Sequence, residues 1–133
     1  MNKKFLLSTV ALFVLSLFLG FLVHAVLLEG DYAQLSNLYR TEQDQMHYFH
    51  WMMLAHAMIA AAFVWIYQQG RTDKPWLGQG IRFGLAAALL MAVPNYLIYY
   101  AVMPLPGALV AKQVILDTVS IVIMGITVAW LNR

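Results

Sequence analysis

A single carboxylate within an apolar segment is the residue in this chain most able to do chemistry. Asp117 lies about ten residues into the run from Gly107 to Trp130, which is otherwise apolar and long enough to cross a bilayer. A carboxylate near the middle of a membrane costs ~2.5–3.5 kcal/mol on insertion scales, so it normally faces a partner inside the protein. Such an acid can bind and release a proton or hold a cationic ligand. It can also serve only to tie two helices together, and both interpretations stay open.

The expected partners of Asp117 follow from the depth of each residue in its span. At ~1.5 Å per residue from the midpoint of each span, Asp117 and His56 fall ~3 Å, and Asn95 ~5 Å, to the outer side of the midplane. Gln113 and Ser120 lie on the same helical face as Asp117, at spacings of four and three residues. We therefore predict an outward-facing polar cavity that combines these five side chains.

A second polar layer, ~12 Å from the midplane by the same rise, contains His24 and His50, with Lys112 close to it. Two neutral histidines on neighbouring helices can ligate a b-type haem, and histidine is also a copper ligand. One helix cannot gather His47, His50 and His56 together, because His56 lies on the opposite side from His47. The sequence predicts no cofactor, and haem b or copper at His24 and His50 is the alternative.

Composition places the chain among integral membrane proteins. Its 133 residues are 62% hydrophobic and 11% charged, far from the balance of a soluble domain. The chain has no cysteine, which excludes disulfides and thiolate metal sites, and its net charge of +2 is too small to indicate nucleic-acid binding. No catalytic motif is present, which favours a protein without catalytic activity of its own.

Hydropathy and helix signals predict an all-α, polytopic membrane protein with one domain over residues 1–133. Four transmembrane helices are expected at about 5–28, 44–68, 77–102 and 107–131, in an antiparallel bundle. Thr41 and Asp44 resemble a helix-capping pair, and Pro94 predicts a kink in the third span. Residues 29–40 show apolar side chains at helical spacing, which predicts a short helix lying on the outer membrane surface.

The distribution of charge predicts the orientation. Six basic residues belong to the N-terminus, the loop between the second and third spans, and the C-terminus: Lys3, Lys4, Arg71, Lys74, Arg82 and Arg133. The other side carries Arg40 with four acids: Glu29, Asp31, Glu42 and Asp44. By the positive-inside rule both termini are cytoplasmic, in what we expect to be a bacterial inner membrane.

Small residues four apart form the clearest packing signal. Gly80, Gly84, Ala88 and Ala92 make one row on the third span, while Ser16, Gly20 and His24 make another on the first. The row on the third span indicates packing within the bundle, with a homo-oligomer interface as the alternative.

The partners we expect are the lipid bilayer, a second copy or another membrane protein. We predict that the polar cavity binds a small molecule or a partner membrane helix. A proton-coupled transporter or channel, formed by a homo-oligomer with Asp117 as the coupling acid, is the first alternative. An electron-transfer subunit that binds haem or copper is the second.

Overall fold

The computed structural model describes residues 2–133, which form helices joined by short turns. Four helical stretches are long and apolar enough to span a membrane: Lys3–Leu27, Glu42–Gly70, Trp76–Val102 and Gly107–Leu131. The all-α class and the four candidate spans are thereby confirmed. The predicted limits agree closely, as 44–68 against 42–70 illustrates.

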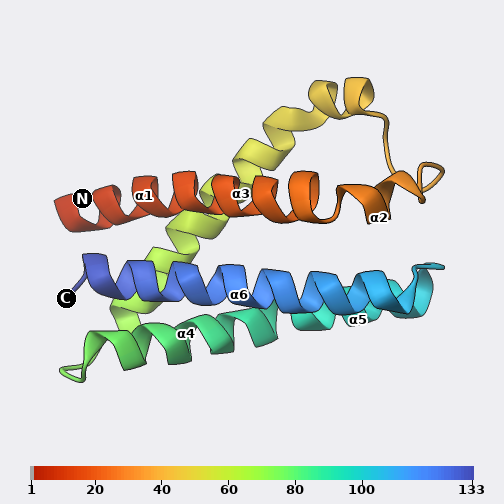
Figure 1. The fold of residues 1–133 in the computed structure, drawn as a ribbon. Coiled ribbons are helices and arrows are strands. Elements are labelled where there is room, and N and C mark those ends of the chain that lie inside the picture. Colours follow the sequence, from red (N-terminus) through yellow and green to blue (C-terminus); the bar gives the residue numbers. More distant parts are fainter. Residues whose placement is uncertain (1) are drawn as a thin grey trace.

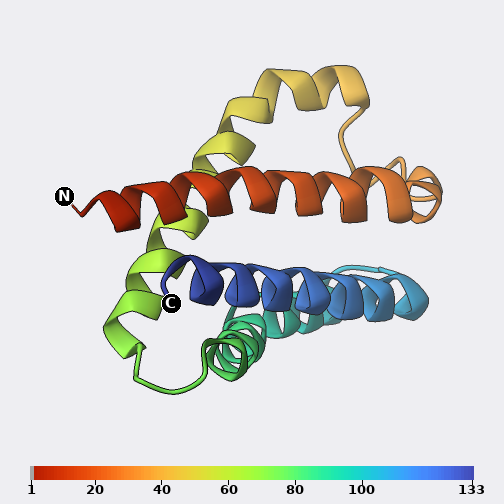
Figure 2. The same cartoon turned by 60° about the vertical axis from the view of Figure 1, so that its left-hand side comes forward.

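The helices form a layered arrangement in which one member crosses the others (Figures 1 and 2). The first stretch comprises α1 (Lys3–Gly20) and η1 (Phe21–Leu27) and lies beside α6 (Gly107–Leu131). On its other side α6 packs along α4 (Trp76–Met91) and α5 (Val93–Val102). The remaining long helix, α3 (Glu42–Gly70), crosses obliquely and contacts α1 mainly, so most of its first half is exposed.

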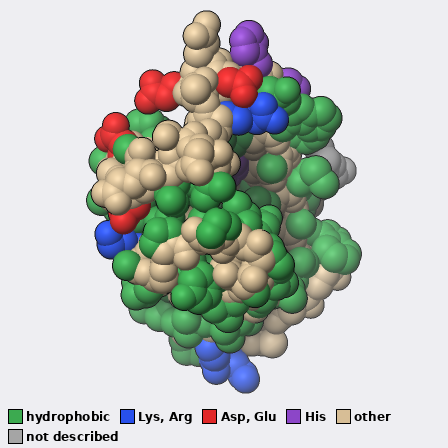
Figure 3. Space-filling view, turned by 90° about the vertical axis from the view of Figure 1, so that its right-hand side faces the viewer, with side chains coloured by type: hydrophobic (Ala, Val, Ile, Leu, Met, Phe, Trp, Pro, Cys, Tyr) green, Lys and Arg blue, Asp and Glu red, His purple; other side chains and the backbone are tan. Residues whose placement is uncertain are grey.

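The two ends of the molecule differ in what they hold. Both termini and the loop 71–75 lie at one end, here called the terminal end (Figure 1). The short helix α2 (Glu29–Ala33) and the turn before α6 lie at the other, here called the α2 end. Figure 3 views the α2 end, where acidic side chains gather over one part of the face and histidines lie nearby.

Local signals account for where the helices begin. The Thr41 side chain accepts a hydrogen bond from the Asp44 backbone N–H at 3.3 Å, which confirms the predicted cap of α3. Asn2 caps α1 in the same way, through the Lys4 backbone N–H at 3.0 Å. Of the helix predicted over residues 29–40, only Glu29–Ala33 is helical, as α2, and the rest of the segment forms turns.

The third stretch is broken at Ala92, between α4 and α5. Pro94, at the start of α5, has no N–H to donate, and its ring crowds the preceding turn. The Asn95 side chain donates to the Met91 carbonyl oxygen at 2.6 Å, which satisfies an acceptor beside the break. The predicted kink at Pro94 is confirmed, although the change of direction falls two residues earlier, at Ala92.

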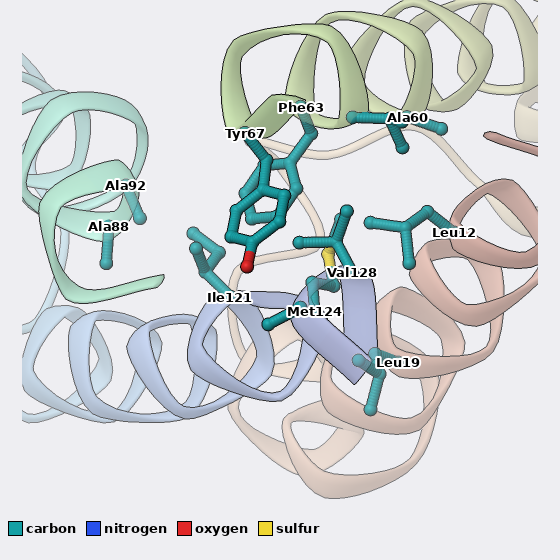
Figure 4. Packing of buried hydrophobic residues seen from close by; sticks show 12 residues of the cluster. Leu12, Leu19, Ala60, Phe63, Tyr67, Ala88, Ala92, Ile121, Met124 and Val128 are labelled. Atoms are coloured by element: carbon teal, nitrogen blue, oxygen red, sulfur yellow. The ribbon is translucent and has the colours of Figure 1, made fainter. Parts of the chain in front are cut away.

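The apolar core lies where α1, α3, α4 and α6 meet. Figure 4 shows Phe63 and Tyr67 of α3 extending toward Val128 and Met124 of α6, with Leu12 of α1 on the other side. Phe83 adds edge-to-face contacts with both aromatic rings of α3, at centroid separations of 4.7 and 5.3 Å. This core fixes where α3 crosses α6.

The row of small residues on α4 packs against α6 within the molecule. A Cβ atom on Gly84 would lie 2.6 Å from the Val122 Cα, and one on Gly80 would lie 2.7 Å from the Gly125 carbonyl oxygen. Glycine on both helices therefore allows the backbones of α4 and α6 to approach closely. Ala88 and Ala92 of the same row are also buried. The prediction of packing within the bundle is confirmed for this row.

A buried amide joins three helices near the terminal end. Asn132 is 1% exposed and donates to the Ser8 hydroxyl oxygen of α1 at 3.2 Å. Its side-chain oxygen accepts from Gln68 Nε2 of α3 at 2.8 Å. No role for Asn132 was predicted from the sequence, because a residue near a helix end is ordinarily solvated. Its contacts hold the ends of α1, α3 and α6 together.

Candidate functional site

Asp117 lies on α6 with each carboxylate oxygen facing a group from another element. The Tyr96 hydroxyl of α5 donates to Oδ2, and His24 Nε2 of η1 lies 3.3 Å from Oδ1. The Asp117 side chain is 18% exposed and that of His24 is 37% exposed. The predicted need for an internal partner is thus met by Tyr96 and His24, while the pair stays partly open on one side.

His24 belongs to a stretch of π-helix that ends the first candidate span. In η1 the backbone turns are wider than in an α-helix, and the last bond runs from the Leu28 N–H to the Val23 carbonyl oxygen at 2.9 Å. Stretches of π-helix are rare in proteins, and those that occur often lie at functional sites. Here the π-helix contains the one histidine that contacts Asp117.

Tyr32 of α2 connects His24 to α6. Its hydroxyl lies 2.7 Å from His24 Nδ1 and accepts a hydrogen bond from Gln113 Nε2 at 3.0 Å. Burial raises the pKa of the Tyr32 phenol, and its hydrogen bond from Gln113 opposes this only in part. The phenol is therefore neutral at physiological pH and keeps a proton to donate.

This geometry is compatible with a His24 ring that carries its proton on Nε2. Because Gln113 donates to the Tyr32 oxygen, the Tyr32 proton can point to His24 Nδ1, which then acts as the acceptor. The ring proton then belongs on Nε2, facing Asp117. We call the five connected residues, Gln113, Tyr32, His24, Asp117 and Tyr96, the Asp117 cluster.

The Asp117 cluster presents more acceptors than donors. Gln113 is 4% exposed, and its Oε1 atom has no hydrogen-bond partner among residues 2–133. Each carboxylate oxygen of Asp117 has further acceptor capacity beyond its one partner. A ligand suited to this cluster would therefore donate hydrogen bonds and carry positive charge.

An ion pair flanks the cluster and holds α2 against α6. Lys112 Nζ lies 3.0 and 3.1 Å from the two carboxylate oxygens of Asp31. The Lys112 side chain is about half exposed, so the pair contributes little stability by itself. Asp31 of α2 thus neutralises the charge of Lys112. The carboxylate of Asp117 can therefore interact with His24 or with a ligand.

Three of the residues predicted around Asp117 have other partners. His56 Nδ1 lies 2.9 Å from the Ser16 hydroxyl oxygen, and its ring packs over Gly20 of α1. Asn95 is exposed and bonds to its own helix, as does Ser120, which donates to the Leu116 carbonyl oxygen at 3.0 Å. Of the five predicted residues, Gln113 alone joins Asp117 in the cluster.

The crossing of α3 and the break at Ala92 keep His56 and Asn95 away from Asp117, although all three residues were predicted at similar depths in their spans. Because α3 crosses obliquely and contacts α1, His56 meets the small residues of α1 and not α6. The break at Ala92 leaves Asn95 exposed, while the next residue, Tyr96, contacts Asp117. Matching depth along separate helices does not say which helices are neighbours.

Sequence reasoning did not connect Tyr32 or Tyr96 with Asp117. Tyr96 stands four residues after Ala92, so it extends the small-residue row that faces α6. The row on α4 could therefore have identified the Tyr96 contact. His24 extends the row of Ser16 and Gly20, but those two residues contact His56 of α3, so that row does not point to Asp117. The position of Tyr32 depends on how the 29–40 segment folds back, and no local pattern specifies that.

The geometry gives no support to a metal or haem centre at the predicted histidines. Both ring nitrogens of His24 face protein groups, and His50 lies exposed on α3, with its ring 5.2 Å from that of Trp51. Within residues 2–133, no three His, Asp or Glu side chains gather closely enough to hold a metal ion. Haem b or copper at His24 and His50 stays a prediction.

The role of Tyr32 can be tested by removing its hydroxyl group. Tyr32→Phe is expected to loosen α2 from α6, raising amide hydrogen exchange over residues 29–33 several-fold, because the bonds to His24 and Gln113 are lost. Tyr39→Phe is the matched control, since the Tyr39 hydroxyl has no hydrogen bond among residues 2–133 while its ring packs on Tyr32. Equal exchange in the two variants would contradict the proposed bridge.

Comparison of the chain with protein-family models, with curated proteins and with solved structures found no match.

Proposed function

We propose that the chain is a multi-pass protein of the bacterial inner membrane, with both termini cytoplasmic, whose Asp117 cluster binds a small molecule. Four candidate spans and the basic residues at the terminal end support this orientation. The α2 end, with its acidic residues, then faces outward. In this orientation the Asp117 cluster lies in the outer half of the membrane. The proposed function is binding, without a catalysed reaction.

One observation carries the proposal: the Asp117–His24 pair is held from α5 and η1 yet stays partly open. A carboxylate in apolar surroundings needs polar partners, and the part of Asp117 that Tyr96 and His24 leave exposed is open to a further one. The free acceptor capacity of the Asp117 carboxylate favours a lipid-soluble primary ammonium group. An interfacial partner helix bearing a lysine near its end offers the same chemistry.

Phenethylammonium, a small primary ammonium with an aromatic tail, is a direct probe of this site. We expect purified protein in nanodiscs to bind it at pH 7, and Asp117→Asn to weaken binding about tenfold to a hundredfold, because a charge-assisted hydrogen bond is lost. Isothermal calorimetry measures the affinity of both proteins for the probe.

Two controls make this experiment decisive. Asp44→Asn removes an equal charge at the α2 end from a residue paired with Arg40, and it should leave binding unchanged. Neutral 2-phenylethanol has the same aromatic tail and should bind the unmodified protein and Asp117→Asn equally. Equal phenethylammonium affinity in the Asp117→Asn and Asp44→Asn variants would overturn the proposed site.

A second function, proton-coupled transport by a homo-oligomer, is favoured by the continuity of the polar contacts. Five side chains connect Gln113 to Tyr96 through His24 and Asp117, so a proton and a cation would compete for one carboxylate. In this version His24, and not His56, is the partner of the coupling acid. Phenethylammonium movement driven by a pH gradient in proteoliposomes, absent from Asp117→Asn, would favour transport over binding alone.

A further inference from the structure

A groove at the terminal end lies between the last turn of α3 and the first turns of α4. It has a volume of about 400 Å³ and is formed by eight residues: Ile66, Tyr67, Gly70, Thr72, Lys74, Gln79, Arg82 and Phe83. Ile66 and Phe83 supply apolar walls, while Lys74 and Arg82 supply positive charge. The groove is therefore amphipathic, with a basic rim above an apolar floor.

The two basic side chains are free of acidic partners. Within residues 2–133, neither Lys74 nor Arg82 lies within 4.0 Å of a carboxylate oxygen. Arg82 donates through Nε to the Gly78 carbonyl oxygen at 3.2 Å, which leaves its two terminal nitrogens unused. The nearby acid, Asp73, lines an adjoining groove that shares Lys74 and Gln79 with this one, and it forms no ion pair with Lys74. The rim thus carries two positive charges that have no ion-pair partner among residues 2–133.

The loop beneath the rim is fixed in place. Gln79 Nε2 donates to the Thr72 carbonyl oxygen at 2.8 Å and to the Lys74 carbonyl oxygen at 2.6 Å. Its Oε1 accepts from the Thr72 backbone N–H at 3.0 Å. One side chain therefore closes the loop 72–74 and holds Lys74 over the groove. A Cβ on Gly70 would meet nothing within 4 Å, so the floor beside it is open.

We propose that this groove binds the phosphate of an anionic phospholipid, with an acyl chain along Ile66 and Phe83. Charge complementarity argues for an anion, and the apolar floor beside the candidate spans argues for an amphiphile over a free phosphate. A basic segment at the cytoplasmic surface is where anionic lipids concentrate. This inference depends on membrane insertion but not on the Asp117 cluster.

The test compares nanodiscs of phosphatidylcholine alone with nanodiscs containing phosphatidylglycerol. Native mass spectrometry should find phosphatidylglycerol retained by the unmodified protein, and Lys74→Gln with Arg82→Gln should weaken retention about thirtyfold. Lys74→Arg with Arg82→Lys keeps the charges and should restore retention. Lys3→Gln with Lys4→Gln removes as much charge at the same end, outside the groove, and should have little effect.

Three results would overturn the proposal. If the Lys3/Lys4 variant lost as much phosphatidylglycerol retention as the Lys74→Gln, Arg82→Gln variant, the positive charge of the whole terminal end, and not the groove, would attract the lipid. Competition by inorganic phosphate at millimolar concentration would assign the site to free phosphate. Gly70→Phe fills the floor without changing charge, so unaltered retention in a folded Gly70→Phe variant would exclude the groove as the seat of the acyl chain. Binding at the Asp117 cluster should be unaltered in all these variants.

Discussion

Replacing Gly84 with valine is expected to destabilise the protein by at least about 3 kcal/mol, through overpacking against backbone that cannot move aside. The first added carbon would already lie 2.6 Å from the Val122 Cα and 3.0 Å from the Ile121 carbonyl oxygen. Both are main-chain atoms of α6, so the whole of α4 would have to move away from α6. Since Tyr96 continues the same helical row, the contact with Asp117 should weaken as well.

Gly78→Val is the matched control for this prediction. It lies on the same helix, and the nearest atom to an added Cβ is a guanidinium nitrogen of Arg82 at 3.7 Å, at the end of a flexible side chain. Its effect on stability should stay within about 0.5 kcal/mol. Thermal unfolding in one detergent compares the two, and equal melting temperatures would show that α4 and α6 are not packed through Gly84.

Asp117→Leu is expected to cost about 1–3 kcal/mol of stability, because it leaves the Tyr96 hydroxyl and His24 Nε2 without their common partner. Asp117→Asn keeps an acceptor for Tyr96 and should cost less than about 1 kcal/mol. The two substitutions thus separate the structural role of Asp117 from its charge. The leucine variant reports on folding, and the asparagine variant reports on ligand binding.

Ser120→Ala provides a control on the same helix. The Ser120 hydroxyl bonds only to the Leu116 carbonyl of its own helix, so its removal should change the melting temperature little. If Asp117→Leu unfolded at the same temperature as Ser120→Ala, the hydrogen bonds of Asp117 would contribute nothing measurable. The cluster would then be a binding site without a structural role.

The fold was largely accessible to sequence reasoning because its determinants are local. Apolar runs of membrane-spanning length, the Thr41 cap and Pro94 predicted the helices to within a few residues. The row of Gly80 and Gly84 predicted a close helix contact, although its partner on α6 was not identified. These features act within one helix, so spacing along the chain reveals them.

The candidate site was accessible only in part because its contacts join distant elements. The cost of burying Asp117 predicted that a partner exists, and Gln113 follows from helical spacing. Choosing His24 over His56 requires the crossing angle of α3, which depends on how Phe63 and Tyr67 pack. Tyr32 reaches the cluster because α2 folds back onto α6 beside the Asp31–Lys112 pair. Neither arrangement is encoded in a short pattern.

We propose that Asp117 and His24 form one polar site that a cationic ligand enters. Solid-state NMR of ¹⁵N,¹³C-labelled protein in bilayers, with and without phenethylammonium, can test this. We expect a His24 ring protonated on Nε2, a cross-peak between that ring and the Asp117 carboxyl carbon, and a shift of both signals when the ligand is added. A His24 ring without contact to Asp117, or signals that the ligand leaves unchanged, would contradict it.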